Sequence, residues 1–78
     1  MTTTIVYHSI VRETEKAILV SLTVTWGSNN HKREMWFPKS VIEYRNEQTM
    51  NVSDWFIKKQ EYANMFHGYV MRFDVIKD

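Results

Sequence analysis

Residues Ala17–Trp26, with the sequence AILVSLTVTW, form the stretch that decides the fold. Every even-numbered position carries a large apolar residue, whereas the odd-numbered positions carry mainly serine and threonine. Successive side chains of a β-strand point to opposite faces of the sheet. The alternation therefore predicts a strand with one buried face, and the rest of the chain is interpreted around it.

A turn and a corner follow this strand. Gly27-Ser28-Asn29-Asn30 predicts a hairpin turn, because glycine and asparagine tolerate positive φ, and we expect a paired strand over residues 31–37. Pro38 lacks a backbone donor and ends that strand. We expect Pro38-Lys39-Ser40 to form a tight corner that returns Val41 and Ile42 to the core.

Two further segments differ in composition from this hairpin. Residues 4–11 are largely β-branched or aromatic and predict a first strand, which the polar residues 12–16 connect to the strand after it. Residues 43–51 are mostly polar, and we expect them to form an exposed loop.

The C-terminal part predicts a helix and a last strand. Ser53 is a suitable N-cap, and Asp54 stands in the first turn, where the helix dipole favours an anion; the helix is expected over residues 54–64. Residues 69–76 alternate again and predict the last strand. The fold class is thus α+β: a bent antiparallel sheet or small open β-barrel of about four strands, with one helix before the last strand, in a single domain over residues 1–78.

Composition indicates where such a domain works. The chain has 78 residues, of which 44% are hydrophobic and 14% aromatic, and it has no cysteine. A small domain without disulfides is typical of a reducing compartment. The N-terminus lacks the basic and apolar regions of a signal peptide, and no stretch is long and apolar enough for a membrane span. We expect a cytoplasmic protein that does not act in a membrane.

Residues with catalytic or metal-binding chemistry are scattered. His8, His31 and His67 stand in no ligand-like motif, and two glycines are too few for a nucleotide-binding loop. The serines occupy a strand, a turn, a corner and a cap, each an ordinary structural position. We expect no enzymatic activity, no cofactor and no metal, and therefore a protein that binds.

Candidate binding residues fall into an aromatic and an acidic group. Trp36 and Phe37 are adjacent on a strand and point to opposite faces, so one of them is a candidate surface anchor, as is one of Trp55 and Phe56; alternatively, all four complete the core. Acidic residues could imitate nucleic-acid phosphates towards a basic partner, although solvated loops carry such charges routinely. They are Glu43, Glu47 and Asp54.

A different class of function is single-stranded nucleic-acid binding. Lys32, Arg33 and Lys39 could form a basic patch beside an exposed Trp36 or Phe37, because small β-barrels hold single strands by charge and base stacking. The net charge of +1 does not favour this partner, and a hairpin tip can also simply be solvated. A third possibility is a structural or oligomerising subunit.

Three blocks of sequence carry a resemblance. They are Glu13-Thr14-Glu15-Lys16-Ala17-Ile18-Leu19-Val20, Trp36-Phe37-Pro38-Lys39-Ser40-Val41-Ile42, and Val52-Ser53-Asp54-Trp55-Phe56. In this order they resemble small uncharacterised proteins of phages and mobile elements. The resemblance implies that the protein works in a host cell and that its partner is a host protein or ribonucleoprotein complex. It implies that the chain inhibits this partner by direct contact, as anti-CRISPR proteins inhibit their targets. It implies no activity and no functional residue.

One packing prediction concerns the start of the helix. Ser53 as cap and Asp54 near water would fix the rotation of the first turn. We then expect Trp55 to pack inward against the apolar face of residues 18–22, while Lys58 and Lys59 cover it with their stems and expose their ammonium groups.

Overall fold

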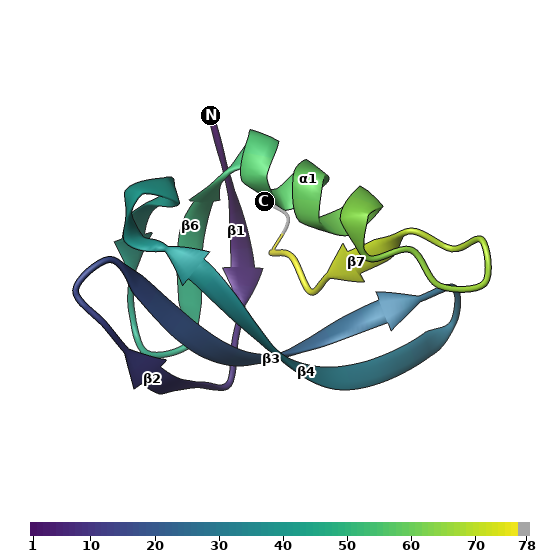
Figure 1. The fold of residues 1–78 in the computed structure, drawn as a ribbon, viewed down its shortest axis with the longest axis horizontal. Coiled ribbons are helices and arrows are strands. Elements are labelled where there is room, and N and C mark those ends of the chain that lie inside the picture. Colours follow the sequence, from purple (N-terminus) through teal and green to yellow (C-terminus); the bar gives the residue numbers. More distant parts are fainter. Residues whose placement is uncertain (77–78) are drawn as a thin grey trace.

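The computed structural model describes residues 1–76 and confirms the α+β class, with one helix before the last strand (Figure 1). The strands make two antiparallel sheets, β1-β6-β5 and β2-β3-β4, with β7 beside β3, and the sheets do not close into a barrel. The sequence predicted about four strands, and the described chain has seven. The elements are β1 (Thr2–Val6), β2 (Ser9–Glu13), β3 (Ala17–Trp26), β4 (Asn29–Pro38), the 3-10 turn η1 (Lys39–Val41), β5 (Ile42–Arg45), β6 (Thr49–Ser53), α1 (Asp54–Ala63) and β7 (Met71–Phe73).

Strand β3 is the centre of its sheet, as the alternation predicted. It pairs with β4 along its whole length and with β2 and β7 on its other edge. The side chains at its even-numbered positions are buried, and those at odd-numbered positions are half-buried on the opposite face. Gly27 has a φ of 61° in the turn to β4, a conformation that glycine adopts without steric cost. The predicted hairpin is confirmed, and β4 starts two residues before the predicted position 31.

The predicted strand over residues 4–11 is wrong, because the chain changes sheets within it. Tyr7 is buried, and its hydroxyl donates to the carbonyl oxygen of Asn46, in the β5–β6 turn of the sheet that contains β1. The backbone N–H of His8 then donates to the carbonyl oxygen of Ser21, at 2.8 Å, so the chain leaves β1 and joins β3 as β2. A run of good strand formers does not reveal such a break, because both halves have the same composition.

The predicted loop over residues 43–51 is also wrong, since most of it belongs to the β5–β6 hairpin. The Asn46 side chain accepts hydrogen bonds from the backbone N–H groups of Gln48 and Thr49, at 2.9 and 2.8 Å, an arrangement that favours a tight turn. Met50 on β6 is fully buried. One side of β6 faces the core and the other side is polar, which gives the segment its hydrophilic composition.

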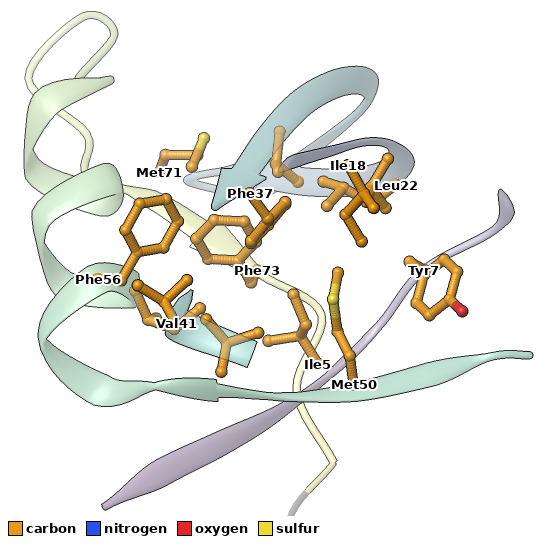
Figure 2. Packing of buried hydrophobic residues seen from close by; sticks show 14 of the residues in the cluster. Ile5, Tyr7, Ile18, Leu22, Phe37, Val41, Met50, Phe56, Met71 and Phe73 are labelled. Atoms are coloured by element: carbon orange, nitrogen blue, oxygen red, sulfur yellow. The ribbon is translucent and has the colours of Figure 1, made fainter. Parts of the chain in front are cut away.

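A cluster of buried hydrophobic side chains, with three phenylalanine rings among them, fills the space between α1 and the sheets (Figure 2). The Phe37 ring lies 5.5 Å from that of Phe56 and 6.1 Å from that of Phe73, measured between centroids. Val41 is buried and Ile42 packs against the cluster, so the corner after Pro38 does return both residues to the core. The cluster joins elements that are far apart in the sequence.

The last strand is shorter than the predicted span of residues 69–76. Residues 71–73 pair with β3, and the chain then crosses to β1, where the N–H of Val6 donates to the Asp74 carbonyl oxygen at 2.8 Å. The N–H of Ile76 donates in turn to the Thr4 carbonyl oxygen at 2.9 Å. This crossing connects the two sheets beneath α1.

Candidate partner-binding surface

The first turn of α1 is rotated differently from the sequence prediction. Trp55 is 61% exposed, whereas Phe56 and Ile57 are buried, so the prediction that Trp55 packs inward is wrong. Ser53 occupies the N-cap position, but its side chain makes no capping hydrogen bond. Asp54 is instead held by the Thr3 hydroxyl, which donates to its carboxylate at 2.5 Å. The side chain of Asp54 thus fixes the start of the helix to β1. Phe56 and Ile57, which follow Trp55 in the sequence, enter the core.

This rotation creates an exposed face with aromatic and basic side chains. Trp55, Lys58, Lys59 and Tyr62 are all exposed on α1. Residues spaced three, four and seven apart lie on one side of a helix, so the two lysines stand between the two aromatic rings. Trp55 and Tyr62 are separated by about 10 Å along the axis, at a rise of about 1.5 Å per residue.

Further large apolar side chains are exposed in the segment that follows α1. Met65, Phe66 and Tyr69 are each more than half exposed. The segment is held in a tight turn, because the N–H of Phe66 and that of Tyr69 each donate to the other's carbonyl oxygen at 2.9 Å. His67 and Gly68 have positive φ values of 49° and 81° within it.

The same segment is anchored to the tip of the β3–β4 hairpin (Figure 1). The Trp26 indole N–H donates to the Asn64 carbonyl oxygen at 2.7 Å, and the Trp26 ring lies 5.8 Å from that of Phe66. A Cβ at Gly27 would lie 3.2 Å from the Tyr69 ring. These contacts hold the segment after α1, with Phe66 and Tyr69, against the hairpin tip.

A groove of about 440 Å³ lies between this segment and β4. Met65 and Phe66 line one side, Arg33 and Met35 line the other, and Trp26 lies between them. The Arg33 guanidinium is 5.2 Å from the centre of the Trp26 ring, which is within the range of a cation–π contact. The groove therefore combines apolar side chains with polar ones, since Arg33, Glu34 and Asn64 also line it.

The chain matches no protein-family model, no curated protein and no solved structure. In residues 1–76 no helix is long and apolar enough to cross a membrane. Three or more histidine, aspartate or glutamate side chains do not gather anywhere in the described chain in a way that would hold a metal ion. Every buried polar side-chain atom of that part has a hydrogen-bond partner.

The two adjacent aromatic residues of β4 are separated by the sheet. Phe37 is fully buried, so its assignment to a partner surface is wrong. Trp36 is 45% exposed on the opposite face, where it pairs across the strands with Leu19. Of this pair, only Trp36 is available to a partner.

The three acidic candidates do not form one surface. Glu43 is exposed on β5, and Glu47 is exposed in the β5–β6 turn. Asp54 lies at the other end of β6 and is bound by Thr3. A five-residue strand separates Glu47 from Asp54, and at about 3.3 Å per residue that is about 16 Å.

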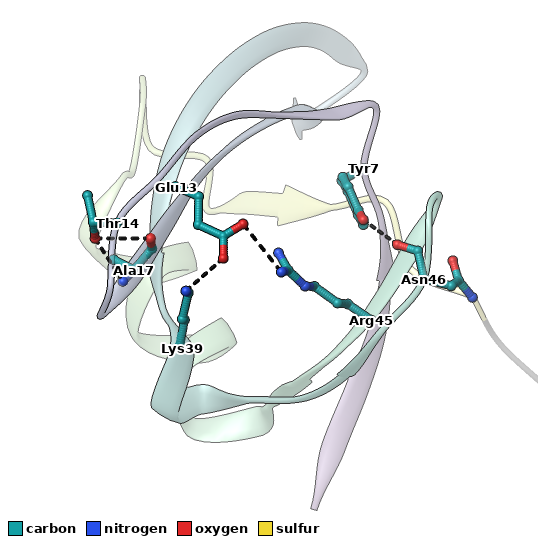
Figure 3. Close-up of polar contacts among 7 residues, drawn as sticks. All are labelled: Tyr7, Glu13, Thr14, Ala17, Lys39, Arg45 and Asn46. Atoms are coloured by element: carbon teal, nitrogen blue, oxygen red, sulfur yellow. Dashed lines mark hydrogen bonds and ion pairs between the residues drawn. The ribbon is translucent and has the colours of Figure 1, made fainter.

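The three basic candidates are likewise dispersed. Lys32 and Arg33 are neighbours on β4, so their side chains point to opposite faces. Lys39 makes an ion pair with Glu13 at 2.7 Å, and Arg45 approaches the same carboxylate at 3.4 Å (Figure 3). The hydrogen bond from Lys39 lowers the pKa of Glu13. Lys39 thus ties β2 to η1 and does not extend a basic patch around Lys32.

Lys58 and Lys59 were predicted to reach solvent, and they do so. Their place in a binding surface was missed, because it depends on which residue of the Trp55-Phe56-Ile57 triplet turns outward. The spacing of Trp55, the two lysines and Tyr62 is visible in the sequence, but it describes a surface only once the buried pair is known.

The half-buried carboxyl of Glu61 on α1 makes the stability of the fold depend on pH. Burial raises the pKa of Glu61 above its ordinary value of 4.5, against the opposing effect of Arg72. The folded state therefore binds this proton more tightly than the unfolded state, and stability falls as pH rises from the unfolded pKa through the folded pKa. We expect Glu61→Gln to remove this fall, as measured by urea unfolding at a series of pH values.

The control for this prediction is Glu47→Gln, which removes an exposed carboxylate from the β5–β6 turn. It should leave that fall unchanged. Parallel curves for the wild-type protein and Glu61→Gln would show that Glu61 titrates alike in the folded and unfolded states.

Proposed function

We propose that the chain is a small non-enzymatic binding protein that inhibits or modulates a host protein or ribonucleoprotein complex in the cytoplasm, with an anti-defence role such as inhibition of a CRISPR effector. One observation carries the proposal of binding: five large apolar side chains of a single segment are more than half exposed. They are Trp55, Tyr62, Met65, Phe66 and Tyr69. The resemblance of the three sequence blocks to phage proteins supports the host setting.

The chemistry of the segment 55–69 supports a protein partner. Trp, Tyr, Phe and Met are the residues enriched in the centres of protein interfaces, and Trp and Tyr are frequent among the residues that dominate binding energy. The tight turn at Phe66 and Tyr69 lowers the entropy cost of binding, because these side chains start from an ordered backbone. Lys58 and Lys59 favour a partner with acidic groups around an apolar centre.

The experiment combines the purified protein with purified CRISPR effector complexes. We expect a stoichiometric complex with one of them, loss of its target cleavage, and protection of a phage from that effector in plaque assays. An effector panel that gives no complex, together with plaque assays that show no protection, would remove the anti-CRISPR version of the proposal.

Single-stranded nucleic acid is the alternative partner, since its bases could stack on Trp55 and Tyr62 while the two lysines contact its phosphates. Titration with single-stranded DNA and RNA, followed by tryptophan fluorescence, separates the two. Binding of nucleic acid alone that weakens steeply with salt would replace the proposed function.

A further inference from the structure

Strand β4 has a long free edge. It pairs with β3 from Asn29 to Pro38, and no other strand of residues 1–76 pairs with it. Unpaired backbone groups along an edge are a template for the addition of another strand. The free edge is ten residues long, and its one proline stands at the end.

The hydrogen bonds of β3 show which groups of β4 point outward. The Ser21 carbonyl oxygen accepts from His8 on the β2 side, and the Lys16 carbonyl oxygen accepts from Lys39 on the β4 side, both at 2.8 Å. Alternate residues of an antiparallel strand bond to opposite neighbours. Odd-numbered residues of β4 thus bond to β3, and even-numbered residues direct their N–H and C=O groups to the free edge. These are Asn30, Lys32, Glu34 and Trp36.

The side chains of this edge carry one charge of each sign. Lys32 and Glu34 are both exposed on the face of the sheet that points away from the core, two positions apart. Neither makes an ion pair within the part of the chain that the structure describes. A charged pair with this spacing can be matched by an identical strand that runs in the opposite direction.

We propose that β4 pairs antiparallel with β4 of a second copy of the chain, in the register centred on Arg33. Lys32 of each copy then lies opposite Glu34 of the other, and the twofold axis produces this pair twice. In this register the outward N–H and C=O groups of Lys32 lie opposite those of Glu34 in the other copy, so the two residues can exchange backbone hydrogen bonds. The inference goes beyond the proposed function and does not depend on what the segment 55–69 binds.

The charges select this register among its neighbours. A centre at Lys32 would bring two lysines together, and a centre at Glu34 would bring two glutamates together; like charges directly opposite each other are unfavourable. In this register Arg33 of each copy lies opposite Arg33 of the other, on the core-facing side of the sheet. Each guanidinium is held over the Trp26 ring of its own chain, and this contact keeps the two guanidinium groups apart.

The arrangement has a consequence for binding. The twofold axis of an antiparallel strand pair runs perpendicular to the sheet, so the two copies of α1 lie on the same side of the joined sheet. The two 55–69 segments then face one direction. Two linked surfaces bind a repeated or symmetric target more tightly than either surface alone.

Charge reversal tests the inference in the full chain. We expect the wild-type protein to show a concentration-dependent monomer–dimer equilibrium in sedimentation experiments. Lys32→Glu alone and Glu34→Lys alone should each weaken dimerisation by about tenfold or more, because both cross-strand pairs become repulsive. An equimolar mixture of the two variants should dimerise again, since both cross-strand pairs of the mixed dimer are then of opposite sign.

Lys58→Glu on α1 and Glu43→Lys on β5 are the matched controls, because they change the net charge equally without touching the edge. Both should dimerise as the wild type does. A wild-type protein that stays monomeric up to millimolar concentration would overturn the proposal, as would single variants that dimerise normally. A mixture that stays monomeric although circular dichroism shows both variants folded would overturn the register.

Discussion

Phe37→Ala is expected to remove a large part of the free energy of unfolding of this domain. The Phe37 ring is fully buried and lies in the aromatic cluster with Phe56 and Phe73. Removal of a buried phenylalanine costs about 3–5 kcal/mol. A domain of 78 residues has a total stability of about 4–12 kcal/mol, at about 0.05–0.15 kcal/mol per residue. Thermal unfolding followed by circular dichroism should show a melting temperature lower by about 12 °C or more.

The adjacent Trp36 provides the control for this prediction. Trp36→Ala removes an even larger side chain, but one that is 45% exposed on the other face of the sheet. We expect it to cost less than about 1.5 kcal/mol, since much of its surface is already in water. Equal losses for the two variants would contradict the assignment of Phe37 to the core and Trp36 to the surface.

The parts of the fold that sequence predicts well are those in which a local pattern and the tertiary structure agree. Ala17–Trp26 is such a case, because all of its even positions face one core. The strand over residues 4–11 was wrong because the change of sheet at Tyr7 and His8 depends on bonds to Asn46 and Ser21. The partners lie 39 and 13 residues away in the sequence, and the composition of residues 4–11 indicates neither bond.

The candidate surface was predictable in kind but not in place. The sequence left open whether one aromatic residue is exposed at Trp36-Phe37 and at Trp55-Phe56, or whether all four complete the core. The first residue is the exposed one in both pairs, although Trp55 was predicted to pack inward. The rotation of α1 is set by the bond between Thr3 and Asp54, which lie 51 residues apart. Capping propensity at Ser53 could not supply that information, because the helix start is fixed by a residue of another strand.

Trp55→Ala is expected to weaken partner binding strongly while the fold remains intact. Trp55 is 61% exposed, and the described contact of its ring with another aromatic side chain is an edge contact to Phe56 at 5.8 Å. Such a contact is worth about 0.5–1.5 kcal/mol, so the melting temperature should change little. In a bound complex the same ring becomes buried, and truncation of a central tryptophan costs about 2–4 kcal/mol of binding energy. The expected loss of affinity is then about 30-fold to 1000-fold.

The measurement is a binding titration against the effector that captures the wild-type protein, with unfolding curves of the same samples. Phe56→Ala is the contrasting variant, because its ring is buried beside Phe37 and its loss should cost about 3–5 kcal/mol of stability. Trp36→Ala controls for the loss of an exposed tryptophan elsewhere, and it should bind as the wild type does. If Trp55→Ala keeps full affinity while Trp36→Ala loses it, the partner binds the outer face of β3 and β4, and the segment 55–69 is not the interface.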